Sequence, residues 1–176
     1  MILREIQKQD KQAILEMYEE YMNSELTPGI DRFEGVRNFE HLGSMSFEEW
    51  LEELEFNKDK TRLPQSFSPQ TTCAAIADNK IVGLINVRWE LVPVLLKLGG
   101  LIGYSIRPSE RGKGHGTEML SLALIEMDSF NRVLVTCKDS NIASKRVIEK
   151  NNGVLENSYS DEDSGCTFLR YWIELK

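Results

Sequence analysis

Hydrophobic and polar residues follow two different periods along this 176-residue chain. Residues 10–25 place Ile14, Met17, Tyr18 and Tyr21 at helical spacing, with acidic residues on the opposite side. This spacing predicts an amphipathic helix with one buried side.

A second helix is predicted within residues 44–59, where Ser46 fits the N-cap and Glu49 completes a capping box. Its apolar side is formed by Phe47, Trp50, Leu51 and Leu54. Residues 30–45, between the two helices, show no clear pattern.

Short apolar or alternating runs predict strands. They lie at residues 2–7, 72–77, 81–89, 101–107, 132–138, 153–160 and 167–175. Two more helices are expected at residues 114–128 and 141–152, and the connector 91–100 has some helical character. The order predicts an α/β fold in one domain, residues 1–176, with a mixed α+β sheet of about seven strands and four main helices.

Composition and charge narrow the function. The formal net charge of −7 argues against broad binding to nucleic acid. The first ten residues carry four charges, which excludes a signal peptide, and the apolar run 91–98 is too short to span a membrane. Three cysteines read as reduced thiols, so a cytoplasmic protein without membrane contact is expected. His41 has no metal-ligand partner at useful spacing, so no metal is expected.

The stretch "RPSERGKGHGTEML", residues 107–120, ends a strand at Pro108 and leads through three glycines into a helix. A helix N-terminus has unpaired N–H groups and partial positive charge, so this arrangement predicts anion binding. A Walker loop is excluded because Lys113 is followed by Gly114 rather than by Ser or Thr. The glycine spacing also differs from the dinucleotide fingerprint. The remaining alternative is that the glycines only form a turn between the strand and the helix.

The pattern Arg-x-x-Gly-x-Gly, formed by Arg111, Gly114 and Gly116, resembles the pyrophosphate loop of the GCN5-related N-acetyltransferases (GNAT). Asn141 and Ser144 stand where this family has polar residues at the start of the next helix. "GYSIRPSERGKGHGTEML" and the late "RYWI" are most similar to a bacterial subgroup of predicted acetyltransferases. The resemblance covers most of the chain and implies the GNAT fold with acetyl-CoA as co-substrate.

The resemblance also implies which residues contact the coenzyme. The pyrophosphate would be held by the N–H groups of Gly112, Lys113, Gly114, His115, Gly116 and Thr117, with added charge from Arg111 and Lys113. The backbone of Ser105 and Ile106 would pair with the pantetheine arm as an added strand does. Asn141 and Ser144 would bind the arm from the other side, although Asn141 also fits a plain helix N-cap.

The catalytic residues are less clear. Glu90, at the end of a long strand, is the candidate base, and a solvated strand-end Glu is the alternative. Many relatives carry a Tyr seven residues after the Asn, where this chain has Ile148. The hydroxyl that protonates the leaving thiolate would then come from Tyr104 or Tyr159, or the thiolate would leave unassisted.

The resemblance implies direct acetyl transfer to an amine of a small molecule or peptide. The alternative is a non-catalytic acyl-CoA-binding or sensor module, favoured by Ile148. Acidic residues in the first two helices and their connector would suit a cationic amine, or would simply form solvated helix faces: Glu19, Glu20, Glu25, Asp31, Glu34, Glu48, Glu49, Glu52 and Glu53. A homodimer formed through the late strands is also expected from the resemblance.

Overall fold

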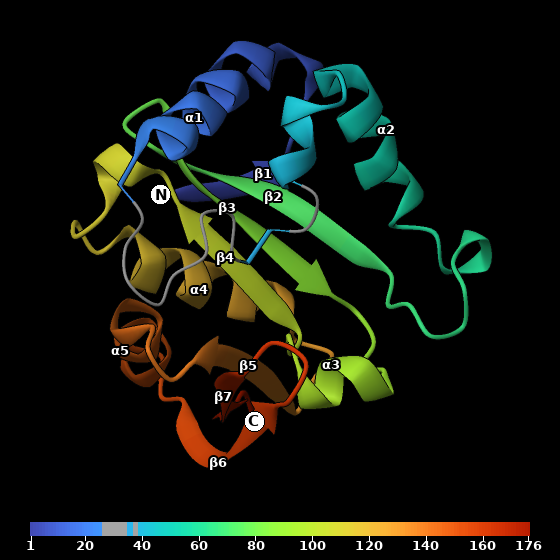
Figure 1. Ribbon diagram of the computed structural model, residues 1–176, viewed down its shortest axis with the longest axis vertical. Coiled ribbons are helices and arrows are strands. Elements are labelled where there is room, and N and C mark those ends of the chain that lie inside the picture. Colours follow the sequence, from blue (N-terminus) through green and yellow to red (C-terminus); the bar gives the residue numbers. More distant parts are fainter. Residues whose placement is uncertain (26–34, 37–38) are drawn as a thin grey trace.

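The computed structural model describes residues 1–25, 35–36 and 39–176 and contains one seven-stranded sheet with helices on both faces (Figure 1). The strands are β1 (Ile2–Glu5), β2 (Gln70–Ala77), β3 (Lys80–Arg88), β4 (Ile102–Ile106), β5 (Arg132–Lys138), β6 (Val154–Asp161) and β7 (Cys166–Glu174). The α-helices are α1 (Lys11–Asn23), α2 (Phe47–Phe56), α3 (Pro93–Lys97), α4 (His115–Glu126) and α5 (Ile142–Lys150). Short 3-10 turns lie at Lys8–Asp10, Phe39–Gly43, Lys60–Arg62 and Pro108–Glu110.

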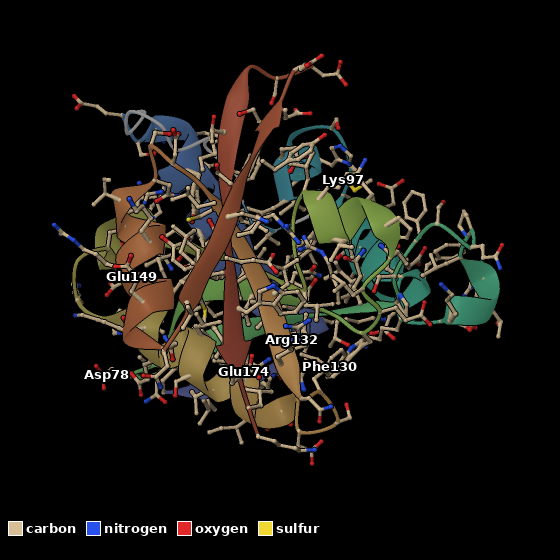
Figure 2. All side chains as sticks on the ribbon, turned by 90° about the horizontal axis from the view of Figure 1, so that it is seen from below. Asp78, Lys97, Phe130, Arg132, Glu149 and Glu174 are labelled. Carbon is tan, nitrogen blue, oxygen red and sulfur yellow. The ribbon has the colours of Figure 1, made fainter. Side chains whose placement is uncertain are left out.

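The strand order is β1-β2-β3-β4-β5-β7-β6. Neighbouring strands are antiparallel except β4 and β5, which are parallel. β5 and β7 pair along their whole length, from Arg132 opposite Glu174 (Figure 2) to Lys138 opposite Phe168. The predicted mixed sheet with four main helices is confirmed, and α3 is a short fifth helix in the predicted connector.

Two apolar cores lie on opposite faces of the sheet. One joins α1 and α2 to the sheet, and its members include Ile14, Met17, Tyr21, Phe39, Trp50, Ala74 and Leu84. The other joins α4 to the sheet, and its members include Ile85, Val87, Ile102, Met119, Leu120, Val135, Ile148 and Tyr171. Successive strand residues point to opposite faces, so the odd-numbered and even-numbered residues of one strand face different cores.

Local signals in the sequence form the expected caps and turns. The Ser46 hydroxyl accepts the Glu49 N–H at 3.2 Å, and the Glu49 carboxylate accepts the Ser46 N–H at 2.7 Å. Asp78 and Asn79 have φ of 48° and 60° in the β2–β3 turn, as a tight hairpin requires. Asn152 has a φ of 63° and forms a left-handed cap after α5. Among the described residues, no helix combines the length and apolar character needed to cross a membrane.

Replacing Ser46 by Ala should lower the free energy of unfolding by about 1 kcal/mol, because the N–H of Glu49 loses its cap. Chemical denaturation monitored by circular dichroism measures this change. Glu52→Ala, at an exposed position of the same helix, is the control and should change the value by a few tenths of a kcal/mol. Equal effects of the two substitutions would contradict the role of the capping box.

Candidate functional site

β4 and β5 separate almost as soon as they meet. Their only register pair is Ile102 with Val135, whereas β3 pairs with β4 along five residues. Beyond Ile102, the edge of β4 that faces β5 has no strand beside it among the described residues. The two strands therefore form an open V in the middle of the sheet, and a glycine-rich loop follows the open end of β4.

The register fixes which backbone groups face this gap. The Arg107 N–H donates to Val82 O at 2.9 Å, and the Arg88 N–H donates to Leu101 O at 2.8 Å, so odd-numbered residues of β4 face β3. The N–H and C=O of Tyr104 and Ile106 face the gap. The backbone groups of Ser105 point towards β3 instead, so Ser105 does not face the gap as predicted. Ile106 does face it, together with Tyr104.

Sequence analysis placed Tyr21 on the buried side of a helix and gave it no polar role. In the structure its hydroxyl lies 2.6 Å from Ser105 Oγ and donates to Ile106 O at 2.7 Å. Tyr21 is fully buried, and burial raises the pKa of its hydroxyl. α1 is thus bonded directly to the end of β4. The sequence signal for this contact was a Tyr, with its polar hydroxyl, at a buried helix position. Its partner could not be identified because Ile106 is 85 residues away in the chain.

The loop after β4 has the form of an anion site. Gly112 and Gly114 have φ of 77° and 89°, a region that residues other than glycine rarely adopt. A Cβ at either position would meet nothing within 4 Å, so both lie against open space. The Thr117 N–H already bonds Gly114 O at 3.0 Å, which leaves the N–H groups of residues 112–116 as candidate donors.

Gly116 has a different role from Gly112 and Gly114. A Cβ at Gly116 would lie 3.1 Å from Val147 Cγ2, so this glycine lets α4 pack closely on α5. The N-terminus of α4 thereby packs on the C-terminal half of α5, where Asn151 Nδ2 also donates to Thr117 O at 3.1 Å. The family motif therefore combines residues that shape the loop with one that sets a helix contact.

Charged side chains near the loop are arranged around Glu110. Its carboxylate accepts hydrogen bonds from Lys80 and Lys113 at 2.6 and 2.7 Å, and His115 Nε2 lies 3.6 Å away. The bonds from Lys113 and Lys80 lower the pKa of Glu110 to about 2. Arg111 turns away from this group, with Nε bonded to Ile106 O at 3.3 Å. The positive charge of Lys113 is thus partly compensated within the protein.

The start of the loop is held by α1. Arg107, which is 6% exposed, forms an ion pair with Glu20 at 2.6 Å, and the Ser109 N–H donates to the same carboxylate at 3.3 Å. Burial alone would raise the pKa of Glu20, but the bonds from Arg107 and Ser109 outweigh it and lower the pKa. This clamp was not predicted from the sequence.

The N-terminus of α5 faces β4 across the gap. Asn141 Oδ1 accepts the Ser144 N–H at 3.0 Å, so Asn141 is the N-cap of the helix. The hydroxyl of Ser144 lies 2.8 Å from the hydroxyl of Tyr104. The structure therefore brings together three of the predicted site residues, and the phenol of Tyr104 spans the open V.

The two remaining catalytic positions lie apart from this group. Glu90 is 44% exposed and pairs with Lys60 at 2.6 Å, beyond the end of β4 that is farther from the glycine loop. The described residues give Glu90 no contact with the loop or with Tyr104. Ile148 is fully buried in the α4 core and provides no hydroxyl.

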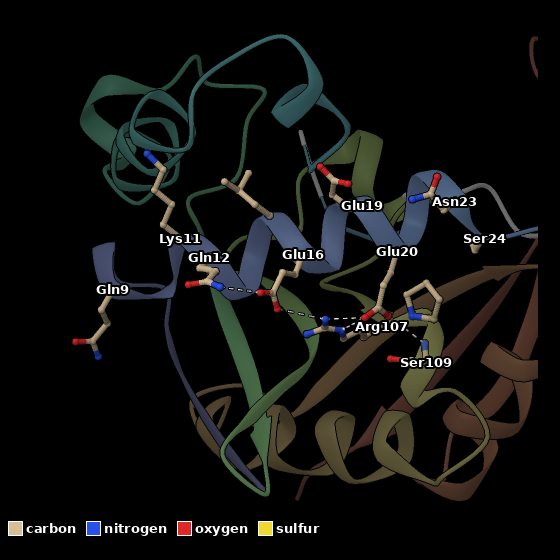
Figure 3. Close-up of a pocket in the computed structure, with 12 residues that line it drawn as sticks. Gln9, Lys11, Gln12, Glu16, Glu19, Glu20, Asn23, Ser24, Arg107 and Ser109 are labelled. Carbon is tan, nitrogen blue, oxygen red and sulfur yellow. Dashed lines mark hydrogen bonds and ion pairs between the residues drawn. The ribbon is translucent and has the colours of Figure 1, made fainter.

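A groove of about 1120 Å³ runs along the outer side of α1 and residues 107–109 (Figure 3). Its acidic side chains are largely engaged: Glu20 and Glu16 pair with Arg107. Elsewhere in the predicted acidic set, Glu48 pairs with Lys11 and Glu49 caps α2, while Asp31 and Glu34 lie outside the described residues. The structure thus gives only limited support to an acidic rim for a cationic amine.

Two glycines meet on the α1 side of β4. Gly103 faces this side, because its neighbours Ile102 and Tyr104 pack in the α4 core. A Cβ at Gly103 would fall on Gly35 O, and a Cβ at Gly35 would fall on the backbone of Tyr104. The chain at Gly35 therefore lies directly on β4 where the V opens. No group of His, Cys, Asp and Glu suited to a metal occurs within the described ranges.

The bonds of Glu110 give a pH prediction. Because its pKa is lowered from 4.5 to about 2, its ion pairs should remain at full strength above pH 4.5 and be lost as the pH falls through about 2. Carboxyl NMR titration should show a midpoint near 2 for Glu110. The double substitution Lys80→Met and Lys113→Met should move the midpoint back towards 4.5, and a wild-type midpoint already near 4.5 would refute this arrangement.

Comparison with solved structures supports the same fold. RimJ from Mycobacterium smegmatis, in complex with CoA-disulfide, is 16% identical with a TM-score of 0.69 over 98% of this chain and 81% of its own. A Salmonella typhimurium acetyltransferase that modifies the N-terminal serine of ribosomal protein L7/L12 is 17% identical with a TM-score of 0.65, covering 99% and 94%. A chimera of the Vibrio cholerae spermidine N-acetyltransferase SpeG and hSSAT is 15% identical with a TM-score of 0.60, covering 99% and 96%.

No curated protein matches the chain by sequence. The family model described as "Acetyltransferase (GNAT) domain" matches residues 1–154, which is most of the chain. Together with the open V between β4 and β5 and the loop at the N-terminus of α4, this match shows that the chain belongs to the GNAT acetyltransferase family.

Proposed function

We propose that this chain transfers the acetyl group of acetyl-CoA directly to an amine of a small molecule or peptide. The observation that carries the proposal is the divergence of β4 from β5 after Ile102, followed by a glycine loop at a helix N-terminus. An extended pantetheine arm needs such a gap, and a pyrophosphate needs such a loop. The related structures include enzymes named for a ribosomal protein N-terminus and for spermidine, which supports both acceptor classes.

The coenzyme would lie along β4 with its pyrophosphate on the N–H groups of residues 112–116. On this edge of β4 the N–H of Ile106 would pair with the pantetheine arm, since Ile106 O is already occupied by Tyr21. Ser144 and Asn141 would contact the arm from α5. The thioester would then lie near the point where β4 leaves β5.

Tyr104 is the proposed general acid. In direct transfer the amine nitrogen bonds to the thioester carbon and loses one proton, the carbon–sulfur bond breaks and the sulfur takes a proton. The Tyr104 hydroxyl lies on the strand that carries the pantetheine and bonds Ser144, which orients it across the gap. Glu90 has no comparable support because of its pairing with Lys60, so its role as base rests on the sequence alone.

The remaining expectations stay predictions. They are the cytoplasmic location and the pairing of two copies through the late strands. A non-catalytic acyl-CoA sensor is not favoured, because the chain belongs to an acetyltransferase family.

Ligand binding tests the coenzyme site directly. In thermal-shift and calorimetry measurements, acetyl-CoA and CoA should stabilise the protein, and ATP and NAD should not. At about 100 times its dissociation constant, the ligand should add roughly 2.7 kcal/mol of stability. Gly114→Glu should abolish the shift. Gly165→Glu is the matched control, because Gly165 also has a positive φ and open space but lies in the β6–β7 turn.

Substituting Tyr104 by Phe should lower kcat about 100-fold and leave the dissociation constant of acetyl-CoA nearly unchanged, because a lost general acid affects the chemical step. Steady-state kinetics and calorimetry provide the two values. Tyr159→Phe is the control, because Tyr159 was the other hydroxyl considered. A larger loss of kcat in the control than in Tyr104→Phe would assign the proton to Tyr159 instead.

A further inference from the structure

Glu110 gathers basic side chains at the start of the glycine loop. Its side chain is 11% exposed, and its carboxylate pairs with Lys80 at 2.6 Å and with Lys113 at 2.7 Å. His115 Nε2 lies 3.6 Å from the same carboxylate. Lys80 opens β3, Lys113 belongs to the loop and His115 opens α4, so one carboxylate brings together groups from three segments. The proposed pyrophosphate site accounts for the loop and the helix N-terminus but gives Lys80 no role.

Lys80 presents an ammonium group to solvent beside the loop. Its side chain is 42% exposed, and that of Lys113 is 54% exposed. Lys80 Nζ also lies 3.4 Å from Ser109 Oγ, which places the β2–β3 turn against the start of the loop (Figure 1). An ammonium group has three N–H donors, so a lysine that is bonded to Glu110 can also donate to a second anion. Two ammonium groups around one carboxylate leave the cluster with a net positive charge.

The strand order indicates which part of the coenzyme this cluster would meet. β4 lies between β3 and β5, so Lys80 and the gap that would receive the pantetheine arm are on opposite sides of β4. In coenzyme A the pyrophosphate joins the pantetheine arm to the adenosine. When one arm leaves the loop towards β5, the β3 side is open to the other. The adenosine carries a phosphate on its 3′ oxygen, one ribose away from the pyrophosphate.

We propose that Lys80 and Lys113 bind the 3′-phosphate of the coenzyme, with Glu110 holding both ammonium groups in place. This inference rests on the proposed use of acetyl-CoA. A phosphomonoester carries about 1.5 to 2 negative charges near pH 7 and has three acceptor oxygens, so it suits a pair of ammonium groups. The site therefore selects coenzyme A over dephospho-CoA, which lacks only this phosphate.

The charge of the whole chain makes this selectivity a sensitive measure of a local site. The formal net charge is −7, which disfavours a ligand with an additional phosphate. A preference for the more negative ligand therefore reports positive groups close to the 3′-phosphate rather than the overall charge of the protein.

Calorimetry with CoA and dephospho-CoA tests the inference. The wild-type protein should bind CoA about tenfold more tightly, as expected for charge-assisted hydrogen bonds to one phosphate. In Lys80→Met the ratio of the two dissociation constants should fall to about threefold, because only Lys113 remains. Lys80→Arg keeps the charge and should keep most of the ratio. Because both ligands are measured on the same variant, a general loss of stability cancels in the ratio.

Lys97→Met is the matched control. Lys97 is an exposed lysine of α3 (Figure 2), which precedes β4, whereas the glycine loop follows the other end of this strand. The substitution removes the same charge from the chain as Lys80→Met does. It should leave the ratio at about tenfold.

The outcomes separate this inference from the proposed function. Equal binding of CoA and dephospho-CoA by the wild-type protein would overturn the role of Lys80 and leave the proposed acetyl transfer intact. An unchanged ratio in Lys80→Met, or an equal fall in Lys97→Met, would overturn it as well. Failure of both ligands to bind would instead refute the proposed function, and this inference with it.

Discussion

The single residue pair between β4 and β5 is the constraint on which the rest of the site depends. Backbone groups in the middle of a sheet need partners, and the divergence removes those that β5 would provide. Part of the loss is compensated, because Tyr21 and Arg111 both donate to Ile106 O. The N–H of Ile106 faces the same gap, and in the proposed function it pairs with the extended arm of the coenzyme.

Long-range contacts keep the V open and the loop in place. Tyr104 reaches α5 through Ser144, and Glu20 holds Arg107 and Ser109 from α1. A buried arginine that loses its carboxylate is strongly destabilising, so the clamp at Arg107 is a rigid point. The conformational freedom of the glycines is therefore limited to the segment between Arg107 and the N-terminus of α4. A loop fixed at both ends can present its N–H groups without a large ordering cost on binding.

Much of the fold could be predicted from the sequence because the signals are local. Ser46 and Glu49 are three residues apart and form their capping box within one helical turn. The turn at Asp78 and the cap at Asn152 likewise depend on adjacent residues. The glycine loop was recognised for the same reason, since its spacing and its helix are contiguous in the chain.

The parts of the site that were missed depend on register and distant packing. Ser105 was assigned to the free edge, but a shift of one residue reverses which backbone groups face the gap, and the sequence does not specify that parity. The contacts of Tyr21 and Glu20 join segments more than 80 residues apart.

The replacement of a helical tyrosine by Ile148 changes how the site is connected. Ile148 is buried against the sheet, and a Cβ at Gly153 would fall on its side chain, so this position belongs to the core. The phenol near the gap comes instead from Tyr104 on β4, and it is bonded to Ser144, whose N–H is capped by Asn141. The residues expected to bind pantetheine therefore also orient the proposed acid. In the proposed mechanism coenzyme binding and proton delivery therefore depend on the same short segment at the start of α5.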